Sequence, residues 1–141
     1  MSIKAVVVGA GPIGGAHVKA LQGLSGLLLT HLVDMNTALL ESRCRELGTQ
    51  GLPSIDAIPP DTDFATVATP PGSHAGITRA LLERGFHVFC EKPLTLDMKE
   101  ALALRDLAAA KKLHLGVGFK MRYEPWFQKA RELLPRLGRL Y

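Results

Sequence analysis

The feature of this sequence that most constrains its fold is a glycine-rich turn, GAGPIG at residues 9–14, between segments of different hydrophobic period. Residues 3–8, before the turn, are rich in β-branched side chains, which favours a buried strand. After the turn, apolar residues recur at helical spacing over residues 13–24. A tight turn from a buried strand into a helix is typical of a βαβ unit, so we expect a parallel sheet.

Short apolar runs continue to alternate with longer amphipathic segments along the rest of the chain. We expect strands at residues 27–33, near 51–52, at 64–68, at 87–90 and at 114–118, and a strand that begins at 138–141. We expect helices at residues 37–47, 73–84, 97–112 and from 125 onwards, and one helical turn around 55–58. Asp97 and Glu100 have the spacing of a capping box at the head of one of these helices. The pattern predicts an α/β fold, a single domain with a doubly wound parallel sheet.

Length and composition are those of one globular domain. The 141 residues are 47% apolar and 21% charged, which suffices to bury a core without metal or disulfide. Cys44 and Cys90 have no metal-ligand or redox spacing, so we expect no metal site and a reducing, cytoplasmic location. The first residues are basic and apolar like an export signal, but a phosphate-binding loop explains their glycines better. No apolar run is long enough to span a bilayer, so we expect no membrane partner.

The net charge of +4 is concentrated towards the end of the chain. Residues 111–141 hold eight Lys or Arg and two Asp or Glu. A basic tail can bind nucleic acid, but these residues are interleaved with apolar ones at helical spacing, which favours a solvated helix face. The alternative is that this segment has lost acidic neighbours that a missing part of the chain would supply. Aromatic residues make up only 6% of the chain, without the stacking cluster that single strands need. We therefore expect no nucleic-acid partner.

Each glycine of the turn has a separate use in binding a dinucleotide. Gly9 lets the chain turn sharply out of the strand, and Gly11 leaves the backbone open to a pyrophosphate. Gly14 lets the helix pack closely on the sheet. With Pro12 and Ile13 these residues open a helix, whose free N–H groups and partial positive charge favour phosphate. We expect this turn to bind a dinucleotide; the alternative is a glycine-rich turn that binds nothing.

Asp34 indicates which dinucleotide. It follows Gly14 by 20 residues and ends the second expected strand. A carboxylate there can accept hydrogen bonds from the ribose hydroxyls of an adenosine and would repel a 2′-phosphate. Met35, Asn36 and Thr37 follow, so no arginine lies beside it in the sequence. We expect NAD rather than NADP; the alternative is a helix cap or a surface aspartate.

The loop after the strand at 64–68 is placed to contact the same ligand. It contains Thr69, Pro70 and Pro71. Ligands of open parallel sheets lie beyond the carboxyl ends of the strands, so we expect these residues to contact the cofactor. Without a ligand, such a loop is a plain connection between a strand and a helix. His74 follows at the start of the next helix and, by itself, is more often a packing or capping residue than a catalyst.

A second loop of this kind follows the strand at 87–90. It contains Glu91, Lys92 and Pro93, and it should face the same crevice. A lysine there can bind a substrate hydroxyl or the nicotinamide ribose, and a neighbouring cation or cofactor can lower its pKa towards proton transfer. Spacing alone favours this role no more than a surface ion pair.

Taken in order, these motifs resemble the N-terminal half of the Gfo/Idh/MocA oxidoreductases, the family of glucose–fructose oxidoreductase and inositol dehydrogenase. The resemblance covers essentially the whole chain. It is carried by GAGPIG at 9–14, Asp34, ATPP at 68–71 with His74 and Ala75, EKPL at 91–94 and GVGF at 116–119. The most specific part is HVFCEKP at 87–93, placed after an ATPP-type loop.

The resemblance implies a fold, a cofactor and a reaction. Residues 1–120 would be a Rossmann domain, and residues 121–141 would be an interdomain helix and the first strand of a second, mostly antiparallel α/β domain. The cofactor would be NAD or NADP, and the reaction would be reversible hydride transfer with a sugar, cyclitol or related polyol. Lys92 would be the active-site lysine, and His74, Glu91 and Lys92 would also contact the cofactor. Arg122, within residues 119–123, would border the substrate.

The chain departs from the family in length, because family members usually continue well beyond this point. We expect the C-terminal domain and its relay histidine to be missing, and the chain alone to be catalytically incomplete. We favour a truncated or engineered cofactor domain of a larger dehydrogenase. A naturally short, non-catalytic sensor or regulatory domain and an inactive fragment are the alternatives. An apolar tail predicts self-association; it contains Trp126, Phe127, Leu133, Leu137, Leu140 and Tyr141.

Overall fold

The structure is a computed structural model, and it describes residues 2–138. Six strands form one parallel sheet: β1 (Ile3–Val8), β2 (Leu27–Val33), β3 (Gln50–Leu52), β4 (Phe64–Val67), β5 (His87–Cys90) and β6 (Leu115–Val117). The helices are α1 (Pro12–Gln22), α2 (Thr37–Leu47), α3 (Pro71–Glu83), α4 (Met98–Ala110) and α5 (Pro125–Leu133). Three short 3-10 helices complete the described chain: η1 (Ile55–Ala57), η2 (Lys120–Tyr123) and η3 (Leu134–Leu137).

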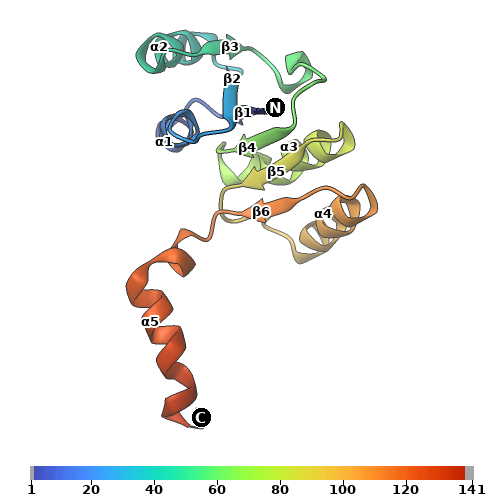
Figure 1. Cartoon of the computed structure of the whole chain (residues 1–141). Helices are drawn as coiled ribbons and strands as arrows, with labels where there is room; N and C mark the ends of the chain where they lie inside the picture. Colours follow the sequence, from blue (N-terminus) through green and yellow to red (C-terminus); the bar gives the residue numbers. More distant parts are fainter. Residues whose placement is uncertain (1, 139–141) are drawn as a thin grey trace.

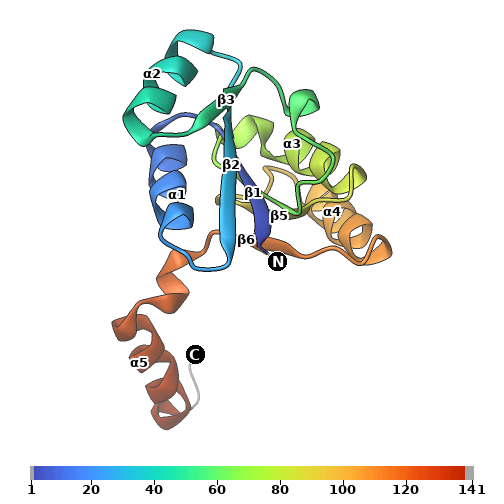
Figure 2. The same ribbon diagram turned by 45° about the horizontal axis from the view of Figure 1, so that its top comes forward.

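The sheet has the strand order β3-β2-β1-β4-β5-β6, and every neighbouring pair is parallel. From β1 the chain first adds strands on one side and then returns to add β4 on the other, so β1 and β4 flank the point where the order reverses. Helices α1 and α2 cover one face of the sheet, and α3 and α4 cover the other (Figures 1 and 2). This arrangement confirms the doubly wound Rossmann fold that the sequence predicts.

Strand β1 lies in the middle of the sheet and contributes to a core on both faces. Because successive side chains of a strand point to opposite faces, Val6 and Val8 pack on one side and Ala5 and Val7 on the other. All four are buried. A strand covered on both faces is expected to be apolar at every position, which explains why β1 shows a continuous run rather than alternation.

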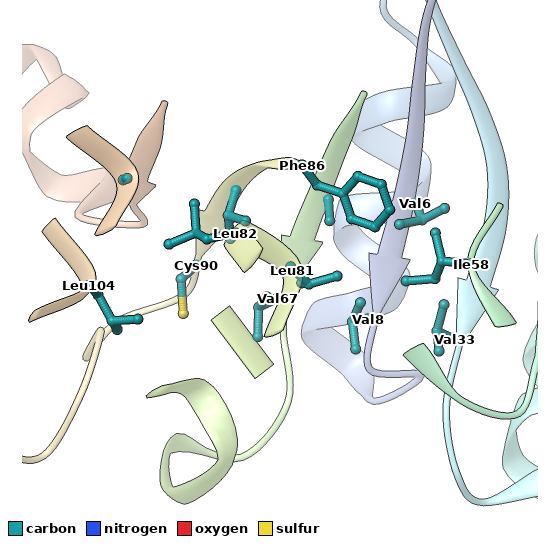
Figure 3. Close-up of a cluster of buried hydrophobic side chains, with 13 residues drawn as sticks. Val6, Val8, Val33, Ile58, Val67, Leu81, Leu82, Phe86, Cys90 and Leu104 are labelled. Atoms are coloured by element: carbon teal, nitrogen blue, oxygen red, sulfur yellow. The ribbon is translucent and has the colours of Figure 1, made fainter. Parts of the chain in front are cut away.

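The larger of the two cores lies between the sheet and the helices α3 and α4. Phe86, Leu81 and Leu82 form its centre together with side chains of β1, β4 and β5 (Figure 3). The smaller core lies under α1 and α2, where Val18 and Leu40 pack against the opposite face of β1 and β2. The two cores hold the sheet rigid between layers of helices, so the strand ends have fixed positions.

Most element boundaries agree with the sequence to within two residues. The expected strand near 51–52 is β3, and the expected turn at 55–58 is η1. Gly48 ends α2 in the left-handed conformation, with φ of 63°, as a C-terminal glycine does. The strand expected to begin at 138–141 lies outside the described residues.

The capping box expected at α4 is only half formed. Asp97 is the N-cap, and its side chain accepts a hydrogen bond from the backbone N–H of Lys99 at 2.8 Å. The backbone N–H of Asp97 donates to the hydroxyl of Thr95 at 3.1 Å. Thr95 thus takes the place that the box assigns to Glu100, because it already lies beside this N–H in the preceding turn.

The C-terminal segment leaves the layered domain after β6. Helix α5 extends away from the sheet, and its main contacts are with η2 and η3 (Figure 1). Its large apolar side chains are therefore open to solvent; Trp126 is 57% exposed and Phe127 is 40% exposed. None of the helices within residues 2–138 is both long and apolar enough to cross a membrane.

Candidate functional site

The glycine turn joins β1 to α1 beside the end of β4. Gly9 has φ of 109°, a conformation that favours glycine, and a Cβ placed there would lie 2.6 Å from the carbonyl oxygen of Ala68. A Cβ on Gly14 would lie 1.7 Å from the carbonyl oxygen of Gly9. Both glycines are therefore required by the packing of the turn itself, as the sequence predicts for a sharp turn and a closely packed helix.

Gly11 is different, because its position is open. It is the N-cap of α1 with φ of −65°, and a Cβ built there would meet no protein atom within 4 Å. No side chain caps this helix end. The N–H groups of Ile13 and Gly14 lie in the first turn, where a helix offers no acceptor of its own. The open surface and the unused donors fit the pyrophosphate of a dinucleotide.

Asp34 lies just after β2 and holds the turn by its carboxylate. One oxygen accepts a hydrogen bond from the backbone N–H of Ala10 at 2.7 Å, and the other accepts from the N–H of Asn36 at 2.8 Å. The cap of α2 is Asn36, whose side chain accepts from the N–H of Leu39. Asp34 is therefore not the helix cap. Each of its oxygens retains a lone pair that can accept a hydrogen bond from a ribose hydroxyl.

The loop after β4 leads directly into α3, which begins at Pro71. The hydroxyl of Ser73 donates to the hydroxyl oxygen of Thr69 at 2.8 Å. Pro70 is the N-cap position and offers no side-chain hydrogen bond, so this helix end is also uncapped. The loop thus presents a fixed threonine and a bare helix end beside the glycine turn.

His74 is fully enclosed, with only 1% of its surface exposed. Its Nδ1 lies 2.6 Å from the carbonyl oxygen of Pro93, and its Nε2 lies 2.7 Å from the carbonyl oxygen of Thr69. Both polar atoms of the ring are used inside the protein. The geometry favours the packing interpretation: His74 ties the loop after β4 to the loop after β5.

Glu91 follows β5 and is held from several sides. Its Oε1 lies 3.0 Å from Nε2 of His17 on α1, and its Oε2 accepts from the backbone N–H of Lys92 at 3.2 Å. A Cβ on Gly118 would lie 3.1 Å from the same carboxylate. The contact with His17 is not predictable from the sequence, because a single histidine in a helical pattern carries no signal of a partner 74 residues away.

Lys92 is exposed, and its bond to Pro93 is cis. Within residues 2–138, its ammonium group has no carboxylate within ion-pair distance. The neighbouring carboxylate of Glu91 is engaged by His17 instead. The surface ion pair that the sequence allows is thus not formed in the described chain, and the ammonium group is available to a ligand.

Two adjoining clefts meet at Lys92. The inner cleft, of about 350 Å³, lies against the glycine turn; it is lined by Ile13, Ala68, Thr69, Pro71, His74, Glu91, Lys92, Gly118 and Lys120. The outer cleft, of about 500 Å³, lies against the C-terminal segment; it is lined by Lys92, Gly118, Phe119, Lys120, Met121, Arg122, Phe127 and Arg131. The fold therefore brings together the ends of β1, β4 and β5, and Lys92 lies where the two clefts join.

Cys90 lies near the site but is unsuited to nucleophilic catalysis. Cys90 is buried under the loop that carries Lys92, and burial, aided by the nearby carboxylate of Glu91, raises the pKa of its thiol to about 11. It is therefore a thiol and not a nucleophile at neutral pH. Residues 2–138 contain no group of three or more side chains able to hold a metal ion.

Comparison with known proteins places this geometry in a family. The family model of Gfo/Idh/MocA, described as "Oxidoreductase family, NAD-binding Rossmann fold", matches residues 3–119. The chain is 32% identical over 136 residues to an inositol 2-dehydrogenase of Rhizobium meliloti. The aligned region covers 95% of this chain and 41% of that protein. It is 31% identical over 126 residues to a UDP-N-acetylglucosamine 3-dehydrogenase of Acidithiobacillus ferrooxidans. This aligned region covers 89% of this chain and 40% of that protein.

A solved structure agrees with these matches. The WlbA dehydrogenase from Chromobacterium violaceum, in complex with NADH and UDP-GlcNAcA, superposes with a TM-score of 0.91 and 28% identity, over 99% of this chain and 42% of that one. The chain thus spans about two fifths of the length of the relatives that it matches. With the parallel sheet, the glycine turn and the lysine loop in place, the chain belongs to the Gfo/Idh/MocA family of oxidoreductases and is its NAD-binding Rossmann domain.

Proposed function

We propose that this chain binds NAD(H) across the ends of β1 and β4, as the cofactor domain of a dehydrogenase. The observation that carries the proposal is the open backbone at Gly11, where a helix end without a cap adjoins empty space. The pyrophosphate would lie on the N–H groups of Ile13 and Gly14, beside Pro12. Thr69 and Pro71, which line the inner cleft, would lie along the path towards the nicotinamide, with Pro70 between them in the same loop.

We further propose a preference for NAD over NADP, set by Asp34. Its carboxylate would accept the adenosine ribose hydroxyls and repel a 2′-phosphate. Calorimetric titration should give NAD at least about tenfold tighter than NADP. Asp34→Asn should narrow that difference, while Asp106→Asn, on the exposed face of α4, should leave it unchanged. Equal affinity for the two cofactors in the unaltered chain would remove this role from Asp34.

The reaction we propose for the complete protein is reversible hydride transfer to or from a carbon that bears a hydroxyl group, in a sugar, cyclitol or related polyol. A bound nicotinamide would supply the hydride chemistry. Lys92, at the junction of the two clefts, would hold the reacting hydroxyl and take part in moving its proton. Glu91 would keep the lysine loop in position through His17. Arg122 would contact the substrate from the outer cleft.

The role of Lys92 is tested in the complete protein. Lys92→Ala should lower turnover by roughly a hundredfold or more, with cofactor affinity changed much less, because proton transfer is lost and the phosphate contacts remain. A fall in cofactor affinity alone would make Lys92 a cofactor clamp.

We propose that residues 1–120 are the cofactor domain and that residues 121–141 lead into a further α/β domain that completes the substrate site. The support is the exposed helix α5, which finds no cover on the sheet domain. The chain of 141 residues alone should then reduce no NAD on a panel of inositols and sugars. Measurable NADH production would contradict this. A stand-alone sensor would need no free lysine at the cleft, so we do not favour that alternative.

Two further proposals concern the state of the chain. The exposed apolar side chains Trp126 and Phe127 should make the isolated chain self-associate. Sedimentation equilibrium should show association that weakens in a Trp126→Gln, Phe127→Gln variant.

We also propose a cytoplasmic location, consistent with two free cysteines. Fractionation of cells that express the native gene would test it.

A further inference from the structure

The outer cleft concentrates positive charge beside Lys92. Its lining includes Lys120, Arg122 and Arg131 in addition to Lys92, and it includes no Asp or Glu. All four side chains are exposed. Within residues 2–138, none of the four forms an ion pair with a carboxylate. Residues 2–138 thus bring four cations to one cleft and supply no ion-pair partner for any of them.

Two acidic side chains in the adjoining hollows have other partners. Glu91 lies in the inner cleft, where it contacts His17 at 3.0 Å. Glu132 lies in a neighbouring hollow together with Arg122 and Arg131, but its carboxylate pairs with Lys129 at 3.0 Å. Like charges that share a cleft repel one another, and a bound anion removes that repulsion.

The other side chains of the cleft suit a sugar ring. Phe119, Met121 and Phe127 are all partly exposed and present apolar surface. The guanidinium carbon of Arg122 lies 5.8 Å from the centre of the Phe119 ring, which orients the guanidinium group. An oriented guanidinium presents parallel N–H donors that match the oxygens of a phosphate.

We propose that the outer cleft binds the phosphate group of a phosphorylated sugar or cyclitol, whose reacting hydroxyl lies at Lys92. This inference rests on the proposed dehydrogenase function and narrows its substrate to an anionic polyol. Lys120 and Arg131 bind the phosphate with Arg122, and the apolar side chains contact the C–H face of the ring. Four cations suit a doubly charged phosphate and leave excess charge around a neutral polyol.

The experiment uses the 141-residue chain and NMR titration, which detects weak binding. Glucose 6-phosphate, glucose and inorganic phosphate are titrated with and without saturating NADH. We expect glucose 6-phosphate to shift the amide signals of residues 118–131 and to bind at least about tenfold tighter than glucose. Its affinity should fall as the salt concentration rises, because exposed charges are screened.

Two double variants with the same loss of charge make the test specific to the cleft. Lys120→Gln with Arg131→Gln should weaken glucose 6-phosphate binding about tenfold. Lys99→Gln with Arg136→Gln removes two exposed cations outside the cleft and should leave the affinity unchanged. Thermal unfolding of both variants confirms that they are folded.

The outcomes separate this inference from the proposed function. Equal shifts from glucose and glucose 6-phosphate overturn it, as does equal weakening in the two variants. Inorganic phosphate that binds as tightly as glucose 6-phosphate also overturns it, since the ring then contributes nothing. If NADH binds while the sugar phosphate does not, the result supports the proposed cofactor role and overturns the proposed phosphate site. If the sugar phosphate binds while NADH does not, the cofactor role falls.

Discussion

At the scale of single residues, two glycines three positions apart serve opposite needs. Gly14 fills a place where the helix touches the backbone of the turn, and Gly11 leaves a place empty. The sequence motif treats both as parts of one signature. The structure separates a glycine that the fold requires from a glycine whose position the fold leaves open.

Matched alanine variants should show this difference. Gly14→Ala should lower the free energy of unfolding by about 2–3 kcal/mol, because its Cβ would lie 1.7 Å from a carbonyl oxygen. Gly11→Ala should leave stability within about 1 kcal/mol, since its φ of −65° suits alanine and its Cβ meets no protein atom. Gly11→Val should nevertheless weaken NAD binding at least tenfold, roughly 1.4 kcal/mol. Urea unfolding and calorimetry measure the two effects, and normal NAD binding by Gly11→Val would refute the phosphate role.

His74 should be required for the lysine loop to keep its position. His74→Ala removes both ring contacts with the carbonyl oxygens of Thr69 and Pro93 and leaves a cavity at a fully buried position. We expect a loss of about 2–4 kcal/mol in the free energy of unfolding. Amide exchange should also rise at Lys92, a local effect that a general loss of packing would not confine to that loop. The control His114→Ala, on an exposed ring, should cost less than about 1 kcal/mol.

At the scale of elements, helix ends determine where the site can form. Helices α1 and α3 both begin without a side-chain cap, whereas α2 and α4 are capped by Asn36 and Asp97. Among the four helices that cover the sheet, the two uncapped ends are those that face the inner cleft, where donors are left for a ligand; α5 also begins without a side-chain cap but does not line that cleft. The capped helices lie at the same sheet but take no part in the cleft.

Two variants test which side chains cap the N-terminus of α4. Asp97→Ala should lower the free energy of unfolding by about 1 kcal/mol, because the N–H of Lys99 loses its acceptor. Glu100→Gln should change it by less than about 0.5 kcal/mol, since Thr95 already accepts the hydrogen bond that a capping box gives to this side chain. Chemical denaturation of both variants checks the order. A larger loss in Glu100→Gln would show that the box is complete after all.

At the scale of the whole molecule, the sheet domain and the C-terminal segment are nearly independent. The cores include β1 to β6 and α1 to α4, and no side chain of α5 is buried. The segment nevertheless forms one wall of the outer cleft. It therefore forms part of a cleft without contributing a buried side chain to either core.

Removal of the segment should show that independence. A chain that ends after Lys120 should melt within about 3 °C of the full chain, because the loss of exposed contacts changes stability little. A chain that ends after Ala110 also lacks β6, which pairs with β5, and should unfold at a much lower temperature. Circular dichroism melts compare the three chains. A large loss in the first truncation would mean that α5 packs on the sheet.

The order of elements, the parallel sheet and the glycine turn could be predicted from the sequence, because these depend on local spacing. Apolar period, helix caps and glycine positions act over a few residues, so they can be read along the chain. The Gfo/Idh/MocA resemblance followed from motifs of the same kind. The limits of local spacing appear at α4, where Thr95 replaced the expected partner Glu100.

Contacts between residues far apart in the sequence became visible only in the folded chain. The contact of His17 with Glu91 and the enclosure of His74 between two loops join residues from separate strand ends. The outer cleft likewise depends on where α5 leaves the sheet, which no spacing along the chain fixes. Such contacts arise because parallel strands end at one edge of the sheet, and the side chains that gather there are adjacent in space and far apart in sequence.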